Sequence, residues 1–169
     1  MKFIKKIKIG ISNLIYWLPI IWYDRNWDYC YIFDILKHKL NAQADFIEKR
    51  NNHFSAEKDV RNMRICSKLC NLVSEGYYEI DWMSYQNTKY KFEPIVGGNY
   101  VIKDDVIYEN FEPYFLKYPK VYKKVLEEHN DVNKLSNREI AIRMGEINHL
   151  RARKLLFKIL ESEIESWWD

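Results

Sequence analysis

Apolar residues recur at intervals of three and four along most of this 169-residue chain, and that spacing constrains the fold more than any other feature. One face of an α-helix presents residues i, i+3, i+4 and i+7, so the pattern predicts amphipathic helices packed around a core. The clearest stripe follows Ser55, a predicted N-cap. Its apolar positions are Val60, Met63, Cys66, Cys70, Val73 and Tyr77.

The same spacing predicts two helices before that stripe. The first covers residues 2–17 and ends before Pro19, because the residue preceding a proline disfavours the helical conformation. The second starts with Asp24 as its N-cap and runs to about Arg50. Trp27 then falls on the inward stripe of the second helix, so we expect it in the core.

The second half of the chain changes character at Ser84. Residues 84–110 lose the helical period, which favours a small β-hairpin or an irregular insertion. Pro119 suits the first position of a further helix that runs to about Asn130. Ser136-Asn-Arg-Glu139 matches a capping box, and it begins a last helix that reaches about Trp167.

These patterns predict a mainly all-α fold, a bundle of about five helices with the insertion at about 84–110. Its length favours a single helical domain over residues 1–169. A net charge of +3 is too small to indicate general nucleic-acid binding. Cys30, Cys66 and Cys70 are odd in number and lack a second ligand pair, so we expect reduced, buried thiols and neither a metal nor a cofactor.

The basic N-terminus has two interpretations. Its apolar positions can pack the first helix on the core, or the helix can lie at a membrane interface with its lysines among the lipid head groups. The apolar run 9–23 is too short to span a bilayer and lacks a cleavage site, so a membrane partner is not expected. The lysines concerned are Lys2, Lys5, Lys6 and Lys8.

A dense aromatic and charged stretch follows the first helix. Indole rings stack on bases or on guanidinium groups, and an arginine can bind a carboxylate or a phosphate with two hydrogen bonds. The stretch therefore predicts a pocket for a small anionic, nucleotide-like ligand, and the alternative is a structural Arg–Asp pair covered by tryptophans. The residues concerned are Trp22, Asp24, Arg25, Trp27, Asp28 and Tyr31.

Two further groups could contribute to such a site. His53 follows a predicted helix and precedes several carboxylates, so it is a candidate general base or simply a solvated turn residue. His149, Arg151 and Arg153 could clamp phosphates, or could form the exposed basic face of a long helix.

The chain ends in Trp167-Trp168-Asp169, after a helix expected to be about 45 Å long at 1.5 Å per residue. Paired tryptophans at a chain end should not remain in water. They either close the core of their own chain or dock on a second copy, and the length of the helix favours a homodimer or higher oligomer.

Three segments together resemble a group of small uncharacterised proteins of tailed bacteriophages: Leu18-Pro-Ile-Ile-Trp-Tyr-Asp-Arg-Asn-Trp-Asp28, Ser55-Ala-Glu-Lys-Asp59 and the final Trp-Trp-Asp. The resemblance implies a phage origin and a place in the host cytoplasm. Phage accessory proteins of this size often counter host defence, some by sequestering nucleotide-derived immune signals. We therefore expect a non-enzymatic binding protein of that kind. The alternatives are an enzyme that degrades the signal, with His53 or His149 as base, and a phage assembly or membrane-associated helical protein.

Overall fold

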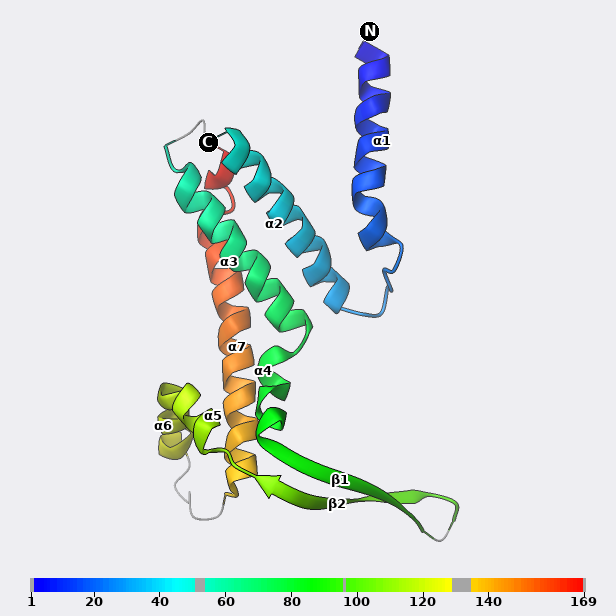
Figure 1. The fold of residues 1–169 in the computed structure, drawn as a ribbon. Helices are drawn as coiled ribbons and strands as arrows, with labels where there is room; N and C mark the ends of the chain where they lie inside the picture. The colour runs from blue at the N-terminus through cyan, green and yellow to red at the C-terminus, as the bar shows by residue number, and fades with distance from the viewer. Residues whose placement is uncertain (1, 51–53, 96, 129–134, 169) are drawn as a thin grey trace. The chain divides into compact units, whose positions relative to one another are not determined.

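The chain is mainly helical with a small β insertion, as predicted (Figure 1). A computed structural model describes residues 2–50, 54–95, 97–128 and 135–168. Internal contacts divide the chain into two compact units, one of Met1–Glu75 with Arg153–Asp169 and the other of Gly76–Ala152. Each unit is described below by itself.

Among the described residues, the first unit contains α1 (Lys2–Ile21), α2 (Cys30–Arg50), α3 (Ala56–Ser74) and the end of α7 (Asn137–Glu163). The short 3-10 helix η3 (Ser166–Trp168) follows α7. Helices α2 and α3 pack side by side. The predicted α3 stripe is confirmed at Met63, Cys66, Cys70 and Val73, which are all buried. Leu40, Ala44 and Ile47 of α2 complete this core.

Pro19 does not end the first helix where the sequence predicted. Helix α1 continues through it to Ile21, with the proline in the last turn. Proline removes one N–H donor, but the following turn still closes because Trp22 N–H donates to Leu18 O at 3.0 Å. A single lost hydrogen bond near the end of a helix leaves the rest of the ladder intact.

The predicted start of the second helix is also wrong. Helix α2 begins at Cys30 rather than after Asp24, and the carboxylate at its start is Asp28, whose Oδ1 accepts the Cys30 N–H at 2.9 Å. Trp27 therefore lies before the helix, and it is 82 % exposed instead of facing the core.

The second unit contains the β insertion between short helices. Its elements are α4 (Tyr77–Ile80), the 3-10 helix η1 (Asp81–Tyr85), strands β1 (Gln86–Pro94) and β2 (Tyr100–Glu109), α5 (Glu112–Lys117), α6 (Pro119–Glu128) and the first part of α7. The strands form an antiparallel hairpin, which confirms that alternative for the insertion. Pro119 opens α6 as predicted.

The predicted capping box at the start of α7 is confirmed. Ser136 N–H and Oγ–H both donate to Glu139 Oε2, at 2.7 and 2.9 Å, and Glu139 N–H donates back to Ser136 Oγ at 3.2 Å. These hydrogen bonds lower the pKa of the Glu139 carboxyl, with the bond from the Ser136 N–H as the largest cause. Two otherwise unpaired backbone donors are satisfied here, which fixes the first turn of a 27-residue helix.

Aromatic residues dominate the core of the second unit. Phe115 and Tyr122 stack with ring centroids 4.5 Å apart, and Trp82 Nε1 donates to Glu79 O at 2.6 Å. Helix α7 reaches this core closely at Gly145, where a Cβ would lie 2.7 Å from the Tyr78 carbonyl oxygen. The buried members are Trp82, Phe111, Tyr114, Val121, Val125, Ile140, Ala141 and Met144.

The C-terminus differs from the predicted continuous helix. Helix α7 ends at Glu163, and Trp167 lies in η3 with only 1 % of its surface exposed. Trp167 thus closes the core of its own chain, which is the alternative to docking on a second copy. The Trp168 side chain and Asp169 lie outside the described residues.

Candidate functional site

The predicted aromatic cluster lies on the linker between α1 and α2. Trp22 and Trp27 are 71 % and 82 % exposed, and the Arg25 side chain between them is exposed as well. Arg25 Nη1 donates a long hydrogen bond of 3.4 Å to the backbone oxygen of Asp24. The two indoles and the guanidinium are therefore accessible to a ligand.

Asp28 and Tyr31 lie at the start of α2. The Asp28 carboxylate accepts the Cys30 N–H, and the Cys30 thiol donates to Ser74 O at 3.4 Å, which ties the start of α2 to the end of α3. Partial burial, followed by the nearby Asp28 carboxylate, raises the pKa of Cys30. Tyr31 is half-buried in the first turn of α2. The cluster is thus part structural and part exposed.

A compact ring contact joins α1 to α2 beside this linker. Tyr16 O–H donates to His38 O at 3.1 Å, and His38 Nε2 lies 3.1 Å from Tyr16 O. The His38 ring is 4.1 Å from the Tyr16 ring and 5.0 Å from the Trp17 ring. These reciprocal bonds and ring contacts hold the last turns of α1 against the middle of α2.

The basic candidates are divided between the two units. His149 and Arg151 belong to the second unit, whereas Arg153 begins the part of α7 assigned to the first. His149 is half-buried, with Nδ1 3.5 Å from Glu79 Oε2, and Arg151 is exposed. His53 lies outside the described residues.

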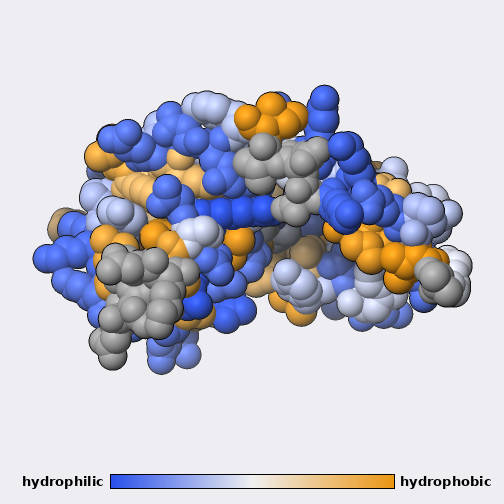
Figure 2. Space-filling view, turned by 90° about the horizontal axis from the view of Figure 1, so that it is seen from below, coloured by the Kyte–Doolittle hydropathy of each residue, from blue (hydrophilic) through white to orange (hydrophobic). Residues whose placement is uncertain are grey.

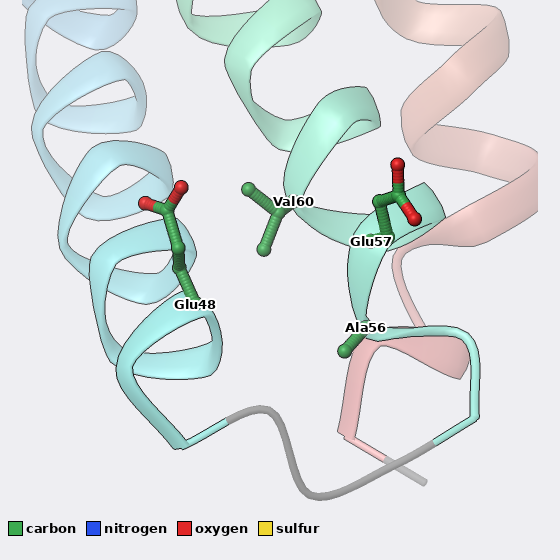
Figure 3. A pocket seen from close by; sticks show the side chains of 4 residues that line it. All are labelled: Glu48, Ala56, Glu57 and Val60. Atoms are coloured by element: carbon green, nitrogen blue, oxygen red, sulfur yellow. The ribbon is translucent and has the colours of Figure 1, made fainter.

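The end of α2 and the start of α3 border a hollow of about 310 Å³ that the sequence did not indicate (Figure 3). Its lining residues are Glu48, Ala56, Glu57 and Val60. Glu48 also pairs with Arg64, which contacts Asp45 as well. Two carboxylates in a small lining disfavour an anionic ligand, so this hollow does not match the predicted phosphate-binding chemistry.

A polar cluster in the second unit was also missed. Lys117 Nζ lies 2.8 Å from Asp81 Oδ2 and 3.2 Å from Tyr77 Oη, and Tyr118 O–H donates to Asp81 Oδ2 at 2.9 Å. Partial burial is the largest single influence on the pKa of Lys117 and would lower it, but the hydrogen bonds to Asp81, Tyr77 and Tyr118 and the Asp81 charge together outweigh burial and raise the pKa. Burial and the Asp81 carboxylate raise the pKa of Tyr118. The partners are 36 residues apart, so no local pattern could reveal them.

The cysteines are free thiols, as predicted. Burial raises the pKa of Cys66 to about 11 and that of Cys70 to about 12, so both stay protonated near neutral pH and react slowly. Cys30 is half-buried rather than fully buried. Among the described residues, no three His, Cys, Asp or Glu side chains come together as metal ligands do.

Comparison with protein-family models, curated proteins and solved structures finds no match for this chain. The resemblance to phage proteins therefore stays a prediction. Within the described ranges, none of the helices combines the length and apolar character needed to cross a bilayer. In the space-filling view from below, hydrophobic patches interrupt the hydrophilic surface (Figure 2).

The first unit has two accessible features, the aromatic linker and the exposed α1 helix.

Proposed function

We propose that the protein is a phage accessory protein that binds and sequesters a small nucleotide-derived immune signal in the host cytoplasm. The observation that carries this proposal is the exposure of Trp22, Arg25 and Trp27 within six residues of one linker. Indole rings stack on any nucleobase, and a guanidinium fits the oxygen geometry of a phosphate.

The expected affinity follows from these contacts. Stacking of a base on an aromatic side chain contributes about 1–3 kcal/mol, and a hydrogen bond to a charged group about 1.5–3 kcal/mol. Two stacking rings and one arginine therefore support a Kd in the micromolar to millimolar range. Asp24 and Asp28 oppose an anion, although Asp28 already accepts the Cys30 N–H.

Isothermal titration of the full chain with cyclic dinucleotides and cyclic ADP-ribose isomers tests the proposal. We expect one ligand class to bind in the micromolar range, and Trp22→Ala or Arg25→Gln to weaken it at least tenfold. Tyr90→Ala is the matched control, because Tyr90 is an exposed aromatic residue of the other unit. Binding no tighter than about 1 mM across the panel, worth roughly 4 kcal/mol, would remove this function.

The fate of the ligand after incubation with the protein separates a binding protein from an enzyme. The observation that favours the enzyme is His149, whose Nδ1 lies 3.5 Å from the Glu79 carboxylate, an arrangement that can orient a general base. Mass spectrometry of the ligand after incubation should recover it intact from a sequestering protein. A cleaved ligand, with cleavage lost in His149→Gln, would establish the enzyme instead.

The predicted homodimer remains a proposal, and the C-terminal tryptophan Trp167 no longer supports it. Trp167 is buried within its own chain, so the support that remains is the length of α7, 27 residues. Light scattering of the purified chain at micromolar concentration should give twice the 20.7 kDa chain mass. A monomer mass over the whole concentration range would contradict the dimer.

A further inference from the structure

Helix α1 carries a continuous apolar stripe along its whole length. At 100° per residue the stripe occupies about 120° of the helix circumference, the width typical of a face that is buried against something. Each of its side chains is nevertheless between 45 % and 75 % exposed. The members of this stripe are Phe3, Ile4, Ile7, Ile11, Leu14, Ile15, Leu18 and Ile21.

The contact between α1 and α2 uses another side of the helix. Tyr16 makes the hydrogen bond to His38 O, and at 100° per residue it lies about 160° from the centre of the stripe. Trp17, the other ring against His38, lies about 100° from that centre. Packing of α1 on α2 within the first unit therefore leaves the stripe exposed.

The charges on α1 have one sign. Four lysines occur within the first eight residues, and the first acidic residue of the chain is Asp24, beyond the end of the helix. Lys5 and Lys6 lie on the polar side and Lys8 borders the stripe, so their long side chains can extend past a buried apolar face to charged groups in water. Apolar residues on one face and lysines on the other are the pattern of helices that lie in the interface of an anionic membrane.

The C-terminal end of α1 adds a second interfacial feature. Trp22 and Tyr23 follow the helix directly and are 71 % and 63 % exposed. Tryptophan and tyrosine are enriched at the level of lipid head groups, because one end of each ring system is apolar and the other is polar. A helix of 20 residues extends about 30 Å, and these two rings directly follow its C-terminal end.

A second copy of the chain fits this surface less well. Two α1 helices joined through their stripes would cover the apolar face but leave Lys5 and Lys6 on the outer side, without a carboxylate on either helix to pair with them. A bilayer with anionic head groups offers hydrocarbon for the stripe and negative charge for the lysines.

We propose that α1 lies flat on the surface of an anionic phospholipid bilayer, with its apolar stripe among the acyl chains and its lysines at the head groups. The stripe and the lysines are separate from the ligand contacts proposed for Arg25 and Trp27, whereas Trp22 belongs to both features. Binding to the bilayer needs no nucleotide. Because its attraction is partly electrostatic, binding weakens as salt increases.

Flotation of the full chain with phosphatidylcholine vesicles, with and without phosphatidylglycerol, tests the proposal. We expect at least a tenfold higher bound fraction on the anionic vesicles at low salt. Leu14→Gln should reduce that binding at least tenfold, and Lys5→Gln with Lys6→Gln should remove the preference for anionic lipid.

Ile9→Gln is the matched control. Ile9 is 52 % exposed on the same helix, but it lies about 180° from the centre of the stripe and should leave binding unchanged. Far-UV circular dichroism checks that each variant keeps its helix content. Equal losses for Leu14→Gln and Ile9→Gln, failure to float with anionic vesicles at low salt, or an oligomer that Leu14→Gln dissociates would each overturn the proposal.

Discussion

Trp167→Ala is expected to lower the free energy of unfolding by about 3–5 kcal/mol, the usual cost of truncating a buried tryptophan. Only 1 % of the Trp167 surface is exposed, although Trp167 lies four residues beyond Glu163, the last residue of α7. Removing the indole ring leaves a cavity in the core, and η3 would have to move inward to fill it. Equilibrium denaturation with urea, followed by circular dichroism, measures the change.

Trp27→Ala is the control for this prediction. The Trp27 side chain is 82 % exposed, and surface substitutions of that kind change stability by about 0.5 kcal/mol or less. The spacing of the sequence had placed Trp27 in the core, so the two variants distinguish the sequence interpretation from the fold. Equal denaturation midpoints for the two variants would contradict the fold at both positions.

Local patterns predicted the elements that depend on neighbouring residues. The capping box forms because Ser136 and Glu139 are three positions apart and need no distant partner. The α3 stripe is correct because its buried residues, such as Met63 and Cys70, share one helix face. Gly76 separates α3 from α4 with a φ of +59°, a conformation that glycine adopts readily.

The same patterns could not say which apolar face is covered. The stripe of α1 has the spacing of a core face, yet Leu14 is 66 % exposed. Periodicity gives the direction in which side chains point, whereas burial depends on whether another element reaches them. That element comes from the tertiary fold, which no window of a few residues contains.

The candidate site shows the same division. Sequence composition identified the aromatic linker, but the choice between a structural pair and an accessible cluster depended on where α2 begins. Because α2 starts at Cys30, the Asp28 carboxylate accepts a backbone N–H at the start of the helix, and Trp27 and Arg25 remain in the linker. Contacts between distant residues, such as Asp81 with Lys117, had no local signal at all.

Gly145→Ala is expected to destabilise the second unit by about 1–3 kcal/mol, the cost of adding a methyl group to a packed site. In an exposed helix the same change would stabilise by about 1 kcal/mol, because alanine has the higher helix propensity. Here the added Cβ would lie 2.7 Å from the Tyr78 carbonyl oxygen and 3.5 Å from Trp82 Cδ1. A backbone oxygen cannot rotate away as a side chain can, so α4 must move from α7.

Gly10→Ala is the same substitution, but we expect it to stabilise its helix. Gly10 lies inside α1, where a Cβ would meet nothing within 4 Å, so alanine should raise the helix content. Urea denaturation compares the stabilities, and far-UV circular dichroism compares the helix contents. Stabilisation by Gly145→Ala would mean that α4 can withdraw from α7 without cost. A loss for Gly145→Ala beside no loss for Gly10→Ala would instead establish that this glycine is required by the close approach of the Tyr78 carbonyl.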